Sequence, residues 1–266
     1  MTTADSGTIK SLVAHRPHHT TIRYTAVGPT DGPALVLIHG WACDRGDFDA
    51  VIGHLPDGHR VLAVDLAEHG ESRSAREVWT MEEFARDVAT VLEAEAVTTA
   101  VVAGHSLGAA VAVEVGRLLP GTVSHVIALD GLHYLSLFPA QREEQADALL
   151  SAFRGDFAAA VRGLVEGGSP AGTDPALADA YFEKMSAVRQ PAGLRAMEGL
   201  VRWDMDAALR GTTQPITVFA IRDLVTQEAI DRYGNRLDIV LVDLGTHHFP
   251  VEAPEATAGL LAAVRS

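Results

Sequence analysis

The chain has 266 residues, enough for one large domain or for one domain that carries an insertion. Hydrophobic residues make up 47% of it and charged residues 21%, which is typical of a globular protein with a substantial core. A formal net charge of −14 repels phosphate backbones and anionic bilayers, so we expect neither a nucleic-acid nor a membrane partner. Cys43 is the only cysteine, which excludes an internal disulfide framework and a thiolate metal cluster.

The N-terminal segment has no feature of a targeting signal. Residues 1–7 contain neither a basic region nor an apolar region, and no apolar run in the chain approaches the roughly 18 residues of a membrane-spanning helix. We therefore expect a cytoplasmic location. The sequence carries no signal for the oligomeric state.

The first half of the chain alternates short apolar segments with amphipathic ones. Residues 9–14 and 20–27 predict two strands of a hairpin. Continuous apolar runs predict buried strands at 34–38, 61–64, 101–103 and 126–129. Helical spacing predicts helices at 48–55, at 80–92 behind a capping box of Thr80 and Glu83, and at 107–119.

This alternation stops between residues 132 and 210, where only helices are predicted, at 141–153, 157–165, 175–188 and 191–201. It resumes with strands at 216–221 and 239–242 and helices at 227–233 and 254–264. The pattern predicts an α/β protein with a mostly parallel eight-stranded sheet and helices on both faces. Residues 1–131 and 211–266 would form the core domain. Residues 132–210 would form a helical lid, inserted after the sixth strand, over the carboxyl edge of the sheet.

Polar residues follow several of the predicted buried strands. His39, Ser106, Asp130 and Asp223 each come at or just after a strand end, and the last strand leads to His247-His248. In open α/β sheets ligands bind at the carboxyl edge, so a serine, candidate acids and histidines are expected to meet there.

Ser106 lies in Gly104-His105-Ser106-Leu107-Gly108, between a predicted strand and a predicted helix. Glycines on both sides let the backbone crowd the serine, which favours a strained turn with an exposed hydroxyl. A serine hydroxyl is a poor nucleophile without a base, and the base needs an acid that fixes its tautomer.

Four motifs in chain order resemble those of the α/β-hydrolase family, and the likeness covers nearly the whole chain outside the lid. The segment around Ser106 resembles the nucleophile elbow, and His39-Gly40-Trp41 resembles the oxyanion-hole loop. Residues 65–72 are similar to a D-x-x-G-H-G-x-S segment, and residues 245–254 resemble the histidine loop. Glu68 departs from the pattern, because the family usually has glycine there; we expect no catalytic consequence.

The resemblance implies that Ser106 attacks an acyl carbon while His248 accepts its proton and later activates water. The backbone N–H groups of Trp41 and Leu107 would hold the oxyanion. His247 adjoins His248 and either could be the base, but the match of His-Phe-Pro-x-Glu to the family pattern favours His248.

The acid has two candidates. Asp223 follows the strand after the lid, the commoner location in the family, and is favoured; Asp130 follows the strand before the lid and is the alternative. His133 and Tyr134 are candidates for the substrate pocket, although packing explains them equally well. The histidines have no metal-ligand spacing and no Gly-rich phosphate loop follows the first core strand, so we expect no metal and no cofactor.

The predicted function is a serine hydrolase that forms an acyl-enzyme. Its partner would be a small-molecule substrate, namely a small to medium, partly hydrophobic carboxylic ester, lactone or thioester. A cofactor-free oxygenase or perhydrolase on the same fold is the alternative, since residues 39–43 resemble the loop of such oxygenases. A non-catalytic ligand binder is a third hypothesis. The predicted complete triad argues against it, because a binder need not keep nucleophile, base and acid together.

Overall fold

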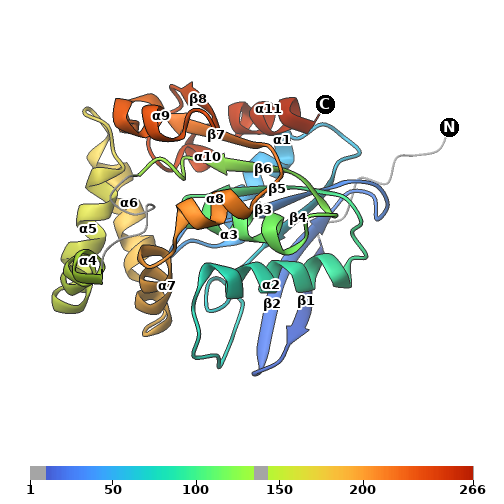
Figure 1. Ribbon diagram of the computed structural model, residues 1–266, viewed down its shortest axis with the longest axis horizontal. Coiled ribbons are helices and arrows are strands. Elements are labelled where there is room, and N and C mark those ends of the chain that lie inside the picture. The colour runs from blue at the N-terminus through green and yellow to red at the C-terminus, as the bar shows by residue number, and fades with distance from the viewer. Residues whose placement is uncertain (1–9, 135–142, 266) are drawn as a thin grey trace.

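The structure is a computed structural model that describes residues 10–134 and 143–265 (Figure 1). The predicted strand at 9–14 and the predicted helix at 141–153 each begin outside the described residues.

The described residues form an eight-stranded sheet in the order β1-β2-β4-β3-β5-β6-β7-β8. The first two strands pair antiparallel with their neighbours, and every pair from β4 to β8 is parallel. The predicted mostly parallel eight-stranded sheet is confirmed. The strands are β1 (Lys10–Arg16), β2 (Thr20–Val27), β3 (Ala34–Ile38), β4 (Arg60–Val64), β5 (Ala100–His105), β6 (Val123–Leu129), β7 (Ile216–Ile221) and β8 (Asp238–Val242).

Alternate residues of the central strands enter two hydrophobic clusters, one on each face of the sheet. On β3, Val36 and Ile38 belong to one cluster, whereas Leu35 and Leu37 belong to the other. This explains the continuous apolar runs, because both faces are covered.

Helices cover both faces of the sheet (Figure 1). The face of Val36 is covered by α2 (Met81–Ala94), α3 (Leu107–Leu118) and α8 (Met205–Gly211). The face of Leu35 is covered by α1 (Asp49–His54), α10 (Phe249–Glu252) and α11 (Pro254–Arg265). The 3₁₀ turns η1 (Arg45–Phe48) and η2 (Arg222–Leu224) and the helix α9 (Gln227–Tyr233) complete the connections.

Four helices between β6 and β7 stand together beside the sheet, at the left of Figure 1. They are α4 (Glu143–Gly155), α5 (Phe157–Gly167), α6 (Pro175–Ser186) and α7 (Ala192–Val201). Aspartate caps begin two of them: the side chain of Asp156 accepts from the Ala159 N–H, and that of Asp174 from the Ala176 N–H. We call these four helices the lid.

The fifth helix of this stretch, α8, is absent from the sequence prediction. It has seven residues and packs on α3 of the core. The division of the chain at 131/132 and 210/211 stays a prediction.

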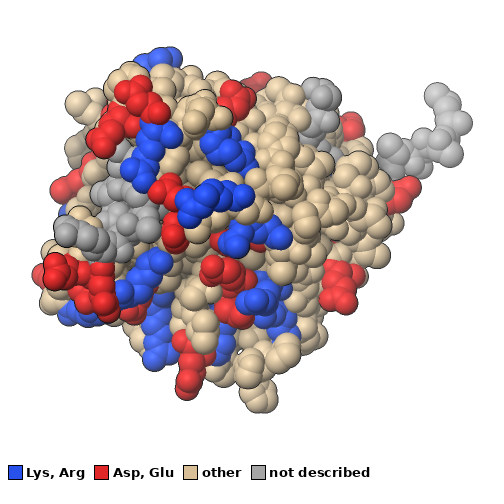
Figure 2. Space-filling view, in the orientation of Figure 1, with Lys and Arg blue, Asp and Glu red and all other residues tan. Residues whose placement is uncertain are grey.

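The surface mixes the two signs of charge. On the face shown in Figure 2, basic and acidic side chains are interspersed. Ion pairs form between such side chains, for example Arg162 with Asp179 at 2.7 Å. Within residues 10–134 and 143–265, no helix combines the length and the apolar character needed to cross a lipid bilayer.

Candidate active site

Ser106 occupies a strained turn between β5 and α3. Its backbone has φ 53° and ψ −115°, a conformation that costs a non-glycine residue about 1–3 kcal/mol. The flanking glycines are required by close approach: a Cβ on Gly104 would lie 2.0 Å from the Gly108 carbonyl oxygen, and one on Gly108 would lie 2.4 Å from that of Ile38. The structure therefore has the strand–turn–helix geometry that the sequence pattern predicts, with the serine at the apex.

Asp130 and His247 form a hydrogen-bonded carboxylate–imidazole pair at this edge of the sheet. Asp130 follows β6, and its Oδ2 atom lies 2.6 Å from Nδ1 of His247. Its Oδ1 atom accepts the backbone N–H of Ile221 at 2.8 Å. Because a carboxylate only accepts, Nδ1 of His247 carries the proton and Nε2 remains as the basic nitrogen.

The environment of Asp130 favours its ionised form. Burial alone would raise the pKa of this carboxyl group. The hydrogen bond and charge of His247, with smaller contributions from His133 and the Ile221 amide, outweigh burial and hold the pKa below its usual value. A buried carboxylate of this kind can orient and stabilise a protonated imidazole.

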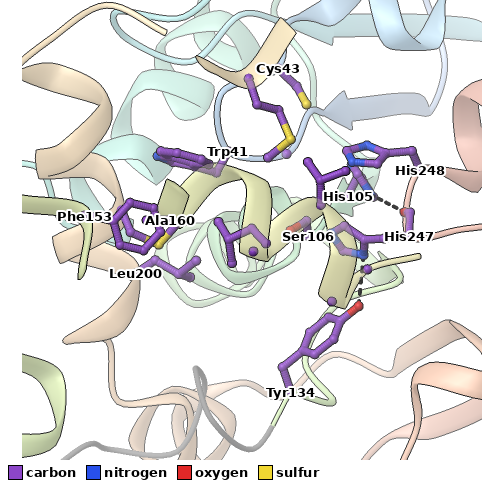
Figure 3. Close-up of a pocket in the computed structure, with 18 of the residues that line it drawn as sticks. Trp41, Cys43, His105, Ser106, Tyr134, Phe153, Ala160, Leu200, His247 and His248 are labelled. Atoms are coloured by element: carbon purple, nitrogen blue, oxygen red, sulfur yellow. Dashed lines mark hydrogen bonds between the residues drawn. The ribbon is translucent and has the colours of Figure 1, made fainter. Parts of the chain in front are cut away.

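The backbone of His247 is held from two sides. Its N–H donates to the carbonyl oxygen of Gly168, at the end of the lid helix α5, at 2.8 Å. Its carbonyl oxygen accepts from Nε2 of His105, the residue before Ser106, at 2.7 Å (Figure 3). Burial lowers the pKa of His105 to about 3, so this ring is neutral and serves as a hydrogen-bond donor.

The structure departs here from the expected pairing of Asp223 with His248. Asp223 is exposed in η2, and no described contact joins it to either histidine. The ring of His248 stacks on Tyr181 of the lid helix α6 at 3.9 Å instead of meeting a carboxylate. Burial, together with the neighbouring His247, lowers the pKa of His248 well below its ordinary value.

The departure has a simple cause. His247 and His248 are adjacent in a loop that turns into α10, so their side chains leave the backbone in different directions. Asp130 directly follows a strand and is fully buried, whereas Asp223 lies one residue further into a surface turn. The spacing of a sequence motif does not show in which direction a side chain leaves the backbone. The position of Asp130 immediately after a strand was the only sequence feature that indicated its place beside the histidine.

His39 fixes the loop that faces Ser106. Its Nε2 atom accepts the Leu66 N–H at 3.0 Å, so Nδ1 carries the proton and donates to the Gly40 carbonyl oxygen at 2.7 Å. A Cβ on Gly40 would lie 3.3 Å from the Ser106 Cβ, which shows how near the loop runs. The next residue is Trp41, whose indole N–H donates to the Gly193 carbonyl oxygen of α7 at 2.8 Å.

Leu107 is the first residue of α3, so its N–H has no partner within the helix. This amide and that of Trp41 belong to the two backbone segments that flank Ser106.

A cavity of about 530 Å³ joins these groups to the lid (Figure 3). Ser106, His247, His248 and Tyr134 line one part of it. No Lys, Arg, Asp or Glu side chain is among the described residues of its wall. The remaining side chains are mostly apolar and come largely from the lid: Trp41, Cys43, Leu149, Ala152, Phe153, Ala160, Leu164, Val165, Met185, Met197 and Leu200.

The two predicted pocket residues occupy different places. Tyr134 lies in the cavity wall, whereas His133 is buried and is not among the described wall residues. Its Nε2 lies 3.5 Å from Oδ1 of Asp130. Burial raises the pKa of the Cys43 thiol, so this cavity residue is a neutral thiol.

Glu68, the departure from the family pattern, attaches the lid. Its backbone has φ 61°, where glycine is favoured. Its side chain accepts from the Ser74 N–H at 2.7 Å and from Nε of Arg189 at 2.9 Å. Arg189, which connects α6 and α7, also donates to the carbonyl oxygens of Gly70 and Ser72, at 3.1 and 2.8 Å.

Comparison with known proteins agrees with this architecture. The model of the alpha/beta hydrolase family matches residues 35–260. The pimeloyl-[acyl-carrier protein] methyl ester esterase of Methylococcus capsulatus is 32% identical over 194 residues, 70% of this chain and 74% of that protein. The non-heme chloroperoxidase of Streptomyces lividans is 36% identical over 115 residues, so the chain spans only 42% of that relative.

Two solved structures are similar to this chain over almost their whole length. Est816, described as an N-acyl homoserine lactone degrading enzyme, has a TM-score of 0.79 at 22% identity over 95% of this chain and 99% of its own. The esterase EaEST of Exiguobacterium antarcticum has a TM-score of 0.78 at 18% identity, over 97% of this chain and 100% of its own. At these identities the likeness shows the fold alone.

Proposed function

Because the chain belongs to the alpha/beta hydrolase family, we propose that it is a serine carboxylic ester hydrolase whose triad is Ser106, His247 and Asp130. One observation carries the proposal. The 2.6 Å contact between Asp130 and Nδ1 of His247 lies at the wall of the cavity that the strained Ser106 also lines. The relatives whose names include esterase support the same class of reaction.

In the proposed reaction the Ser106 oxygen attacks the ester carbonyl carbon while Nε2 of His247 takes the hydroxyl proton. Asp130 stabilises the imidazolium that results. The N–H groups of Trp41 and Leu107 stabilise the oxyanion of the tetrahedral intermediate. When the C–O bond to the alcohol breaks, His247 returns the proton to the leaving oxygen, and Ser106 holds the acyl group.

Water then completes the cycle. His247 takes a proton from a water molecule as the water oxygen attacks the acyl carbon. When the acyl C–O bond to Ser106 breaks, His247 returns this proton to the serine oxygen and the carboxylic acid leaves. The Ser106 hydroxyl makes no capping hydrogen bond to α3. Its bond to His247 is expected to close with substrate, because catalytic hydrogen bonds are often long in free enzymes.

The cavity supports an uncharged, largely apolar substrate. A charged group buried there would lose its hydration without gaining a charged partner from the described wall, which is costly. The volume of about 530 Å³ lies within the range of small-molecule pockets. We therefore propose a small to medium neutral ester, or a lactone of similar size, rather than a substrate with a charge at its buried end.

The proposal is tested with the purified protein and p-nitrophenyl esters of short and medium acyl chains. We expect a burst of p-nitrophenol followed by turnover, and covalent labelling of Ser106 by a fluorophosphonate probe, located by peptide mass spectrometry. The Ser106→Ala variant should lose both. A wild-type protein that neither hydrolyses these esters nor reacts with the probe would refute the proposal.

A further inference from the structure

Tyr134 closes a triangle of contacts with the acid and the base. Its phenol oxygen lies 2.9 Å from Oδ2 of Asp130 and 3.0 Å from Nδ1 of His247. The third side, between Asp130 and His247, is 2.6 Å. Figure 3 shows the phenol pointing at the His247 ring from the wall of the cavity.

The direction of each hydrogen bond follows from the chemistry of the three groups. The carboxylate of Asp130 only accepts, so the phenol donates its proton to Oδ2. A lone pair of the phenol oxygen then faces the N–H at Nδ1 of His247. Burial and the nearby charge of Asp130 raise the pKa of Tyr134 well above its ordinary value, so the phenol keeps this proton.

Both neighbours of the Nδ1 proton are thus acceptors, the carboxylate and the phenol oxygen. This arrangement holds the imidazole in the tautomer that exposes Nε2, and it limits rotation of the ring. Among the described residues, the titratable rings near the pair are those of His105 and His248, 4.7 and 5.3 Å from the His247 ring, and His133 beside Asp130. Burial lowers the pKa of each of these three histidines, which favours their neutral forms.

We propose that Tyr134 is a positioning residue that holds His247 and Asp130 in their reactive arrangement. The inference rests on the proposed triad. It differs from the sequence-based expectation that Tyr134 lines the pocket for substrate. A pocket residue would change KM according to the size of the acyl group, whereas a positioning residue changes kcat for every substrate alike.

The test compares Tyr134→Phe with the wild type on p-nitrophenyl esters from acetate to octanoate. We expect kcat to fall by about 10- to 100-fold, the range for a hydrogen bond to a charged group, with KM nearly unchanged across the series. Tyr233→Phe is the matched control, because Tyr233 is also buried but lies on α9 outside the cavity wall, and it should keep wild-type kinetics. Circular dichroism of both variants checks that they fold.

A double-mutant cycle supplies the second measurement. If Tyr134 acts through Asp130, then adding Tyr134→Phe to Asp130→Asn costs much less than it costs alone. An equal loss in both backgrounds would overturn the proposal, as would unchanged kcat with a KM that shifts with acyl size. Failure of the proposed triad itself is seen separately, as full activity of Ser106→Ala or of His247→Ala.

Discussion

His247 and His248 are neighbours in the chain with different surroundings. One ring meets a buried carboxylate and a phenol, and the other stacks on Tyr181. Tyr181 in turn donates to Glu252 at 2.9 Å, and Glu252 accepts from the Thr246 N–H. His248 therefore belongs to the network that shapes the loop, while His247 has the partners of a general base.

Matched pairs of variants test this division of roles. Asp130→Asn should lower kcat by about 10⁴-fold, because an amide permits the wrong histidine tautomer, while Asp223→Asn should stay close to the wild type. Likewise His247→Ala should lower kcat by about 10⁶-fold, because it removes the general base itself, and His248→Ala should lower it much less. Steady-state kinetics on one p-nitrophenyl ester suffices. A larger loss in Asp223→Asn than in Asp130→Asn would restore the pairing that the sequence favoured.

At the scale of elements, lid helices are tied to the loops that carry the chemistry. Helix α5 holds His247 through the Gly168 carbonyl group, and α7 holds Trp41 through that of Gly193. The segment between α6 and α7 is tied to the core through Arg189 and Glu68. These contacts hold the segments of the candidate site in place against the lid helices.

Replacing Glu68 with glycine should separate two effects: the backbone strain at residue 68, and the contact of its side chain with Arg189 of the lid. The change relieves the positive φ, worth about 1–2 kcal/mol, but it removes the acceptor of Arg189. We expect faster hydrogen exchange of the backbone amides at 187–194 with little change in the melting temperature. Arg189→Met removes the same contact without relieving strain, so it should show the faster exchange with a lower melting temperature. Unchanged exchange in both variants would show that this contact does not hold the lid.

The elbow offers a test of close packing. Gly104→Ala would place a Cβ 2.0 Å from a backbone oxygen, which cannot move aside without distorting the turn, so we expect a loss of about 1–3 kcal/mol or failure to fold. Gly259→Ala on α11 meets nothing within 4 Å and should instead stabilise the chain by about 0.5–1 kcal/mol. Urea unfolding measures both. Similar effects of the two changes would contradict the steric explanation.

At the scale of the whole molecule, buried neutral histidines make stability depend on pH. Burial lowers the pKa of His69 to about 3, with a further contribution from His39, and burial lowers that of His105 to about 3 as well. In the unfolded chain both titrate near 6.5. Between these values the unfolded chain binds more protons, so the free energy of unfolding falls as the pH falls below about 6.5.

Urea unfolding at about pH 5 and about pH 7.5 should therefore show lower stability at the acidic value. His69→Gln removes one of these buried groups and should reduce this difference. His54→Gln, at an exposed position on α1, serves as the control and should leave it unchanged. If His69→Gln keeps the full wild-type difference, buried His69 is not its source.

Local features of the sequence determined the order of strands and helices and the turn at Ser106. Strands β3 to β7 are buried on both faces, which produces continuous apolar runs in the sequence. The turn at Ser106 leaves no room for a Cβ at 104 and 108 and so requires glycine there. Each of these patterns spans only a few consecutive residues and can therefore be recognised from the sequence. Membership of the family follows from the same ordered motifs.

Tertiary structure alone decided which carboxylate meets which histidine, where the Tyr134 phenol lies, and what Glu68 binds. Asp130 and His247 are 117 residues apart, and Glu68 and Arg189 are 121 apart. Whether such side chains meet depends on the direction in which each leaves its loop. That direction is set by packing between segments distant in the chain, which no local pattern records.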